Sequence, residues 1–103
     1  MLVTATQIKI KSIIGFFRFI PRVKNIQEQL RKADGLIFHK FKGFRTFTGW
    51  ENKEAMEAFR NNGHHVDAMK NIKKIGWSKS ITWESQSEPD WHEAIEKLRE
   101  VQF

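Results

Sequence analysis

The hydrophobic pattern of the chain switches repeatedly between two periods. Alternating apolar and polar residues, many of them β-branched or aromatic, are typical of strands, whereas apolar residues three and four positions apart mark amphipathic helices. The elements expected from this pattern are a strand at 2–10, a helix at 12–33, strands at 35–44 and 45–51, helical segments at 52–75, a strand at 80–84 and a helix at 87–101 opened by Ser87 and Pro89.

Residues that start or stop helices set most of these boundaries. Ser12 and Asn52 precede the first two helical regions, where a side-chain oxygen can cap free backbone N–H groups. Pro21 lacks a backbone donor and is expected to kink the first helix or split it. Gly35 can end that helix in a left-handed conformation, and the run at 61–63 (Asn-Asn-Gly) should break the second helical region in two.

The expected order of elements is strand, helix, strand, strand, helix, strand, helix. A chain of 103 residues can build one core of its own, so residues 1–103 are expected to form a single domain. This order predicts an α+β fold of the ferredoxin-like type, βαββαβ, with an added C-terminal helix. Such a fold by itself says nothing about chemistry.

The second and third expected strands are apolar at both parities, whereas a half-exposed strand would alternate cleanly. The two sides expected from strict alternation are Leu36, Phe38 and Phe44 on one, and Ile37, Phe41 and Phe47 on the other. Helices should cover one face of such a sheet, and a chain of this size leaves few elements for the other. A second subunit is the natural cover, so the pattern predicts a homodimer.

Composition narrows the classes of function. The chain has no cysteine, which excludes disulfides, thiolate nucleophiles and cysteine-bound metals, and we expect a cytoplasmic protein. The net charge of +6 comes from lysines and arginines spread along the sequence, which favours solubility over a dedicated anionic partner. The apolar run 13–20 is interrupted by Arg18 and too short to cross a bilayer, so neither a signal peptide nor a membrane partner is expected.

Nucleic-acid binding is the weakest of the alternatives. The segment 42–47 (Lys-Gly-Phe-Arg-Thr-Phe) resembles the aromatic strand of RNA-recognition modules, which share the predicted topology. Those modules need two aromatic rings on the same face of the strand. Phe44 and Phe47 are three residues apart and should point to opposite faces.

One histidine lies on an apolar stripe. His65 shares the spacing i, i+4, i+7 with Met69 and Ile72, and no histidine has a spacing that would bind zinc, so no metal is expected. His65 is either a core histidine bonded to a backbone carbonyl or an acid/base group in a pocket. Trp50, Phe59 and Met69 are likewise either core side chains or the walls of such a pocket.

These residues carry a family resemblance. Trp50-Glu51, Glu54-Ala55-Met56, Phe59, His65 and Met69 resemble the segment W-E-x-x-E-A-L-x-x-F…H-x-x-x-M of the dimeric α/β-barrel superfamily, which includes the antibiotic biosynthesis monooxygenases. The chain is most similar to a branch related to spheroidene monooxygenase. The resemblance implies a homodimer and a pocket between sheet and helices, with Trp50 and His65 near it.

The better-known enzymes of that superfamily are cofactor-independent oxygenases or haem-degrading enzymes. Haem degradation uses an Asn in strand one, a Trp on the second helix and a later haem-binding His. Here strand one has Thr4, Thr6 and Gln7, the Trp position holds Phe59, and the His position falls near Met69. We therefore expect no cofactor, with haem as the alternative that these departures disfavour.

Two hypotheses follow from the residues and the resemblance together. In the first, the protein is a small monooxygenase-like protein that binds an apolar aromatic or isoprenoid substrate. His65 would be the catalytic residue, and Trp50, Phe59 and Met69 would bind the substrate. In the second, it is a non-catalytic dimeric protein that binds a small ligand or serves as a scaffold.

Overall fold

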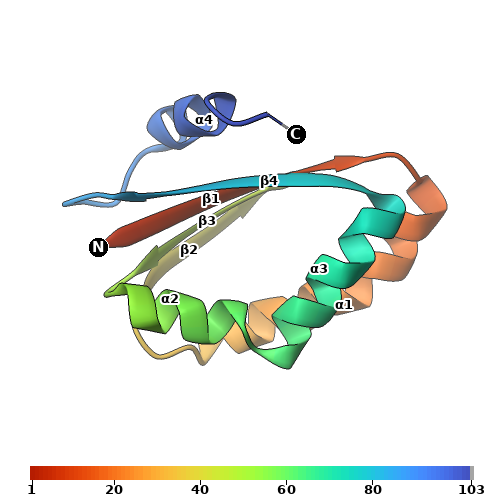
Figure 1. The fold of residues 1–103 in the computed structure, drawn as a ribbon, viewed down its shortest axis with the longest axis horizontal. Helices are drawn as coiled ribbons and strands as arrows, with labels where there is room; N and C mark the ends of the chain where they lie inside the picture. The colour runs from red at the N-terminus through yellow and green to blue at the C-terminus, as the bar shows by residue number, and fades with distance from the viewer. Residues whose placement is uncertain (103) are drawn as a thin grey trace.

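A computed structural model describes residues 1–102, apart from the side chain of His64. The expected order of elements is confirmed (Figure 1). The elements are β1 (Leu2–Ile10), α1 (Ile13–Arg31), β2 (Leu36–Lys42), β3 (Arg45–Trp50), α2 (Lys53–Arg60), α3 (Gly63–Ile75), β4 (Gly76–Glu84) and α4 (Trp91–Arg99).

The strands form one antiparallel sheet in the order β2-β3-β1-β4. Helices α1, α2 and α3 lie against one face of this sheet, and α4 lies against the other (Figure 1). This is the predicted ferredoxin-like α+β arrangement with an added C-terminal helix. Among residues 1–102, no helix has the length and apolar character needed to cross a membrane.

The predicted helix caps are confirmed, but some boundaries differ. The Ser12 hydroxyl accepts a hydrogen bond from the Gly15 N–H at 3.1 Å, and the Asn52 side chain accepts one from the Ala55 N–H at 2.8 Å. Helix α1 runs through Pro21 without splitting. The last helix begins later than expected, because Asp90 rather than Ser87 caps its first turn.

The structure corrects the predicted faces of β2. The β2–β3 pairing shifts register between Leu36 and Phe38, and this single irregularity inverts the alternation that follows. Phe38 therefore packs with Phe47 on the α4 side, whereas Leu36 packs below the helices and Phe41 and Phe44 line their cavity. Phe44 and Phe47 lie on opposite faces, as predicted. The sequence placed Phe38 on the face of Phe44 and Phe41 on the face of Phe47, and both of these groupings are wrong.

The core has a part on each side of the sheet. On the helical side, Phe19, Ala68 and Ile72 form one buried cluster at the junction of α1 and α3. A second cluster on that side surrounds Leu30 and Trp50. The α4 side has a separate cluster, whose buried members are Ala5, Phe47, Ala94 and Leu98.

The α4 cluster changes the argument for a dimer. The sequence predicted that one chain of this size has too few elements to cover both sheet faces. Helix α4 covers part of that face itself, with Trp91 packing on Phe47 at a ring-centroid distance of 4.4 Å. The apolar character of β2 and β3 on that side is thus explained within one chain.

Candidate functional site

A cavity of about 900 Å³ lies between the helical face of the sheet and helices α1, α2 and α3. Every second residue of β1 and β3 points into it, because side chains alternate along a strand. Phe19 and Val23 of α1 form part of the opposite wall. A volume of this size is typical of small-molecule sites in proteins.

Trp50, Phe59 and His65 form an aromatic row along one side of the cavity. Trp50 is 1% exposed, and its ring centroid lies 5.3 Å from that of Phe59. The Trp50 Nε1–H donates a hydrogen bond to the Thr48 hydroxyl at 3.0 Å, which satisfies its polar atom and sets the ring orientation. The imidazole of His65 lies edge-on to Phe59, with a centroid distance of 5.2 Å.

His65 has the physical character of a proton acceptor. It is half-buried on α3, and its Nδ1 atom makes no hydrogen bond to any described residue. Burial lowers the pKa of His65 below its ordinary value of 6.5. A hydrogen bond to the Arg60 backbone partly opposes this shift, and the positive charge of Arg60 adds to it. The imidazole is therefore neutral at pH 7, when one ring nitrogen can accept a hydrogen bond or a proton.

All four residues proposed from the sequence line this one cavity. Met69 is 43% exposed and lies one helical turn beyond His65, so it borders solvent rather than the core. Trp50 is fully buried and reaches the cavity as a wall. The roles predicted for these residues stay predictions, but their meeting around one volume fits a shared site.

The sequence did not predict the hydroxyl-lined floor of the cavity. Its members are Thr4, Thr6, Thr46, Thr48, Ser78 and Ser80, which come from three adjacent strands. The Thr4 hydroxyl lies 2.9 Å from that of Thr82 and also donates to the Met56 sulfur at 3.2 Å. The sequence does carry a signal for this floor, namely threonine at alternate positions of β1 and β3, since alternate residues of a strand lie on one face.

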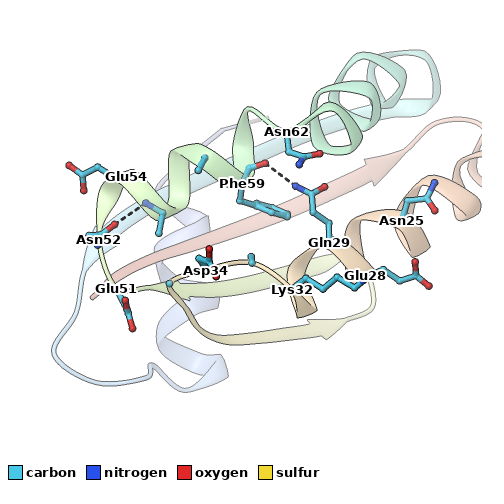
Figure 2. Close-up of a pocket in the computed structure, with 14 residues that line it drawn as sticks. Asn25, Glu28, Gln29, Lys32, Asp34, Glu51, Asn52, Glu54, Phe59 and Asn62 are labelled. Atoms are coloured by element: carbon cyan, nitrogen blue, oxygen red, sulfur yellow. Dashed lines mark hydrogen bonds between the residues drawn. The ribbon is translucent and has the colours of Figure 1, made fainter.

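A second hollow of about 740 Å³ lies at the other end of the helical layer, between the end of α1 and α2 (Figure 2). Its lining includes Glu28, Asp34, Glu51 and Glu54. The Gln29 side chain donates a hydrogen bond to the Phe59 carbonyl at 3.3 Å across it (Figure 2). In Figure 2 the carboxylates of Glu51 and Glu54 point away from this bond, so they do not converge on a ligand.

The described side chains, which exclude that of His64, hold no group of three or more His, Asp or Glu placed to bind a metal ion, and cysteine is absent from the chain. No protein-family model matches the chain. No curated protein matches it in sequence either.

Solved structures do match the fold. An antibiotic biosynthesis monooxygenase is similar with a TM-score of 0.72 and 14% identity, over 84% of this chain and 100% of that one. SnoaB, a cofactor-independent oxygenase from Streptomyces nogalater, has a TM-score of 0.66 and 6% identity, over 84% and 94% of the two chains.

A conserved protein of unknown function from Bacteroides thetaiotaomicron is similar at a TM-score of 0.69 and 16% identity, over 82% of this chain and 96% of that one. The fold of this chain is therefore the ferredoxin-like fold of the antibiotic biosynthesis monooxygenases. At these identities the likeness concerns the fold alone, and function has to be argued from the cavity.

Proposed function

We propose that the protein is a small monooxygenase-like protein that binds an apolar aromatic or isoprenoid substrate in the cavity between sheet and helices. We further propose that residues 1–103 act as one antibiotic-biosynthesis-monooxygenase-like domain of the branch related to spheroidene monooxygenase. The observation that carries the proposal is the neutral imidazole of His65, whose Nδ1 atom has no hydrogen-bond partner among the described residues, inside a cavity with mainly apolar walls.

The walls favour a flat or elongated apolar substrate. Trp50 and Phe59 offer ring faces and edges, and Met69 offers a flexible thioether at the solvent border. In such surroundings a substrate hydroxyl needs a hydrogen-bond partner, because an unsatisfied buried polar group is costly. His65 supplies an acceptor for it, and the threonine hydroxyls of the floor supply others.

The chemistry that suits these residues is oxygenation driven by the substrate's own electrons. His65 would accept a proton from an activated methylene group, and the resulting anion would reduce molecular oxygen. One oxygen atom ends in the substrate as a carbonyl, and the other leaves as water with the two hydrogens of the methylene group. We propose that no cofactor takes part, and SnoaB is an oxygenase of the same fold that is described as cofactor-independent.

The residues present do not fit the haem-degrading pattern. Phe59 stands where that pattern has a tryptophan, and the position of its haem-binding histidine falls near Met69. The inner face of β1 presents Thr4 and Thr6, with no asparagine in that strand.

The alternative is a non-catalytic protein that binds a small ligand in the same cavity. The half-buried side chains of His65 and Phe59 suit a binding protein as well as an enzyme, so their placement does not separate the two functions. Consumption of oxygen on addition of a bound substrate that carries an activated methylene group separates the two, because a binding protein would leave oxygen unchanged.

We also propose a homodimer in the cytoplasm. Beyond the area that α4 covers, the second sheet face has Trp77, which is 48% exposed. A second subunit could cover the ring of Trp77. This support is independent of the apolar residues below α4.

The test uses two probes that differ by one hydroxyl group, 9-phenanthrol and phenanthrene. Binding is followed by quenching of tryptophan fluorescence, and any small molecule that co-purifies is identified by mass spectrometry. We expect His65→Leu to weaken 9-phenanthrol binding by about three- to tenfold and to leave phenanthrene binding unchanged, because only the phenol loses a hydrogen bond.

The matched control is His92→Gln, which alters an exposed histidine on the opposite side of the sheet. Equal losses for both probes would make His65 a wall of the cavity rather than a hydrogen-bonding group. Failure of both probes to bind the unaltered protein, with no co-purified ligand, would overturn the proposed binding function.

A further inference from the structure

The first two turns of α1 expose a group of large apolar side chains to solvent. Ile13, Ile14 and Phe17 are 73%, 71% and 64% exposed, although the same helix buries Phe19 and Leu30. We call Ile13, Ile14 and Phe17 the α1 patch. Aliphatic and aromatic side chains this exposed on one short segment indicate a surface that is covered in use.

Basic side chains border the α1 patch. Lys11 precedes it and Arg18 follows it, and both are exposed. Lys74 joins them from α3, because the next residue, Ile75, accepts hydrogen bonds from the backbone N–H groups of Lys11 and Ser12 at 2.8 and 3.2 Å. The start of α1 and the end of α3 lie together at one end of the molecule (Figure 1).

Acidic residues are absent from the segments that build this end. The sequence has no Asp or Glu in 1–27, in 35–50 or in 68–83. The nearest carboxylate along α3, that of Asp67, is paired with Arg22 at 2.8 Å. The other end of the helical layer carries Glu51 and Glu54, so these carboxylates lie away from the α1 patch.

We infer that the α1 patch docks on the surface of an anionic lipid bilayer. Exposed isoleucine and phenylalanine side chains can insert among acyl chains, while a border of lysine and arginine binds the anionic headgroups. A second copy of this chain would bring two basic surfaces together, which Coulomb repulsion opposes. Nucleic acid would use the cations but gives isoleucine side chains no apolar environment.

Docking in this way would place the cavity beside the membrane. Phe16 and Ile20 of α1 line the cavity, and Phe16 contacts the ring of Phe44 at a centroid distance of 5.4 Å. These residues lie on the same helical turns as the α1 patch, so an apolar ligand leaving the bilayer would have a short path inward. The docking itself does not depend on the proposed oxygenase chemistry.

Co-sedimentation with vesicles tests the inference directly. The probes are vesicles of phosphatidylcholine alone and vesicles with about 30% phosphatidylglycerol, at low and high salt. We expect the full chain to bind the anionic vesicles, and binding to fall as salt rises. Replacing Ile13, Ile14 and Phe17 together by Ser should lower the partition coefficient by about tenfold or more.

A second variant removes charge instead of apolar surface. Lys11→Gln with Lys74→Gln should weaken binding to anionic vesicles by about fivefold for each cation removed. Two controls lie at the opposite end of the molecule. These are Ile37→Ser, which alters an exposed apolar residue of β2, and the pair Lys32→Gln with Lys53→Gln, and both should bind like the unaltered protein.

Circular dichroism verifies that each variant keeps its fold. Absence of binding to anionic vesicles by the unaltered protein would overturn the inference, and so would equal loss in the control variants. Salt-sensitive retention of duplex DNA or RNA without vesicle binding would assign this end to nucleic acid. Loss of self-association in the Ser variant, again without vesicle binding, would assign it to a second copy.

Discussion

At the scale of single residues, His65 is a half-buried polar side chain that lines the cavity. The cavity walls around it are mainly apolar, and its Nδ1 atom has no hydrogen-bond partner among the described residues. The imidazole makes a hydrogen bond to the Arg60 backbone, as a core histidine would, but its buried Nδ1 atom is left unsatisfied, which is costly unless a ligand pairs with it. This feature supports a role toward a bound ligand.

The lowered pKa of His65 predicts a pH-dependent stability. Above pH 6.5 the imidazole is neutral in both the folded and unfolded states, so its stabilising contribution is fully present. As the pH falls below 6.5, the unfolded state takes up a proton first, and the free energy of unfolding should decrease until the lower pKa of the folded state is reached. Urea unfolding at a series of pH values measures this.

His65→Gln should remove that part of the pH dependence and cost less than about 1 kcal/mol at pH 7, since the Gln side-chain amide can keep a hydrogen bond to the Arg60 backbone. His92→Gln is the control, because His92 is exposed on α4. A loss of several kcal/mol at pH 7 in His65→Gln would show that His65 is structural.

At the scale of elements, the β2–β3 hairpin and α4 determine what each sheet face does. The register shift after Leu36 directs Phe38 to the α4 side, where it packs with Phe47. Gly49 lies directly below the Phe38 ring, and a larger residue there would displace that ring. Phe44, beside the hairpin turn, packs on Phe16 of α1 instead.

Truncating Phe47 and Phe44 should therefore have unequal effects on stability. Phe47→Ala should cost about 3–5 kcal/mol, because it opens a cavity below Trp91 in the α4 cluster. Phe44→Ala should cost less than about 1 kcal/mol, because Phe44 is 49% exposed. Urea denaturation of both variants measures the difference, and equal losses would contradict the assignment of Phe47 to a buried layer.

At the scale of the whole molecule, two features concern partners. Lys11, Arg18 and Lys74 border the start of α1 in the fold, although Lys74 is distant from the other two in the sequence, and this border supports the membrane surface that we infer as a partner. The sequence predicted no membrane partner, since a run such as 13–20 cannot span a bilayer. The open part of the second sheet face, with Trp77, concerns a second subunit.

The proposed homodimer has a direct measurement. The chain should sediment at equilibrium with twice its monomer mass of 12.2 kDa at micromolar concentration. A specific interface should bury at least about 1,000 Å², and Trp77→Ser should weaken it if that ring is covered. Ile37→Ser tests an exposed residue elsewhere, and a monomer mass for the unaltered chain would contradict the dimer.

Local patterns in the sequence determined the order of elements, the caps at Ser12 and Asn52, and the break at 61–63. They could do so because capping and hydrophobic period depend on residues within one or two turns of each other. The spacing of His65 and Met69 on one helix also placed them on a common side. Trp50 and Phe59 were added to this predicted site because of the family resemblance.

Tertiary structure alone decided how distant segments met. The face of Phe38 depended on an irregular pairing with β3, and the hydroxyl floor arose from three strands laid side by side. Whether α4 would cover the sheet could not be read from its own periodicity, which shows only that it has an apolar side. The pKa of His65 likewise depended on burial by the whole fold, because desolvation is set by every segment packed around a charge.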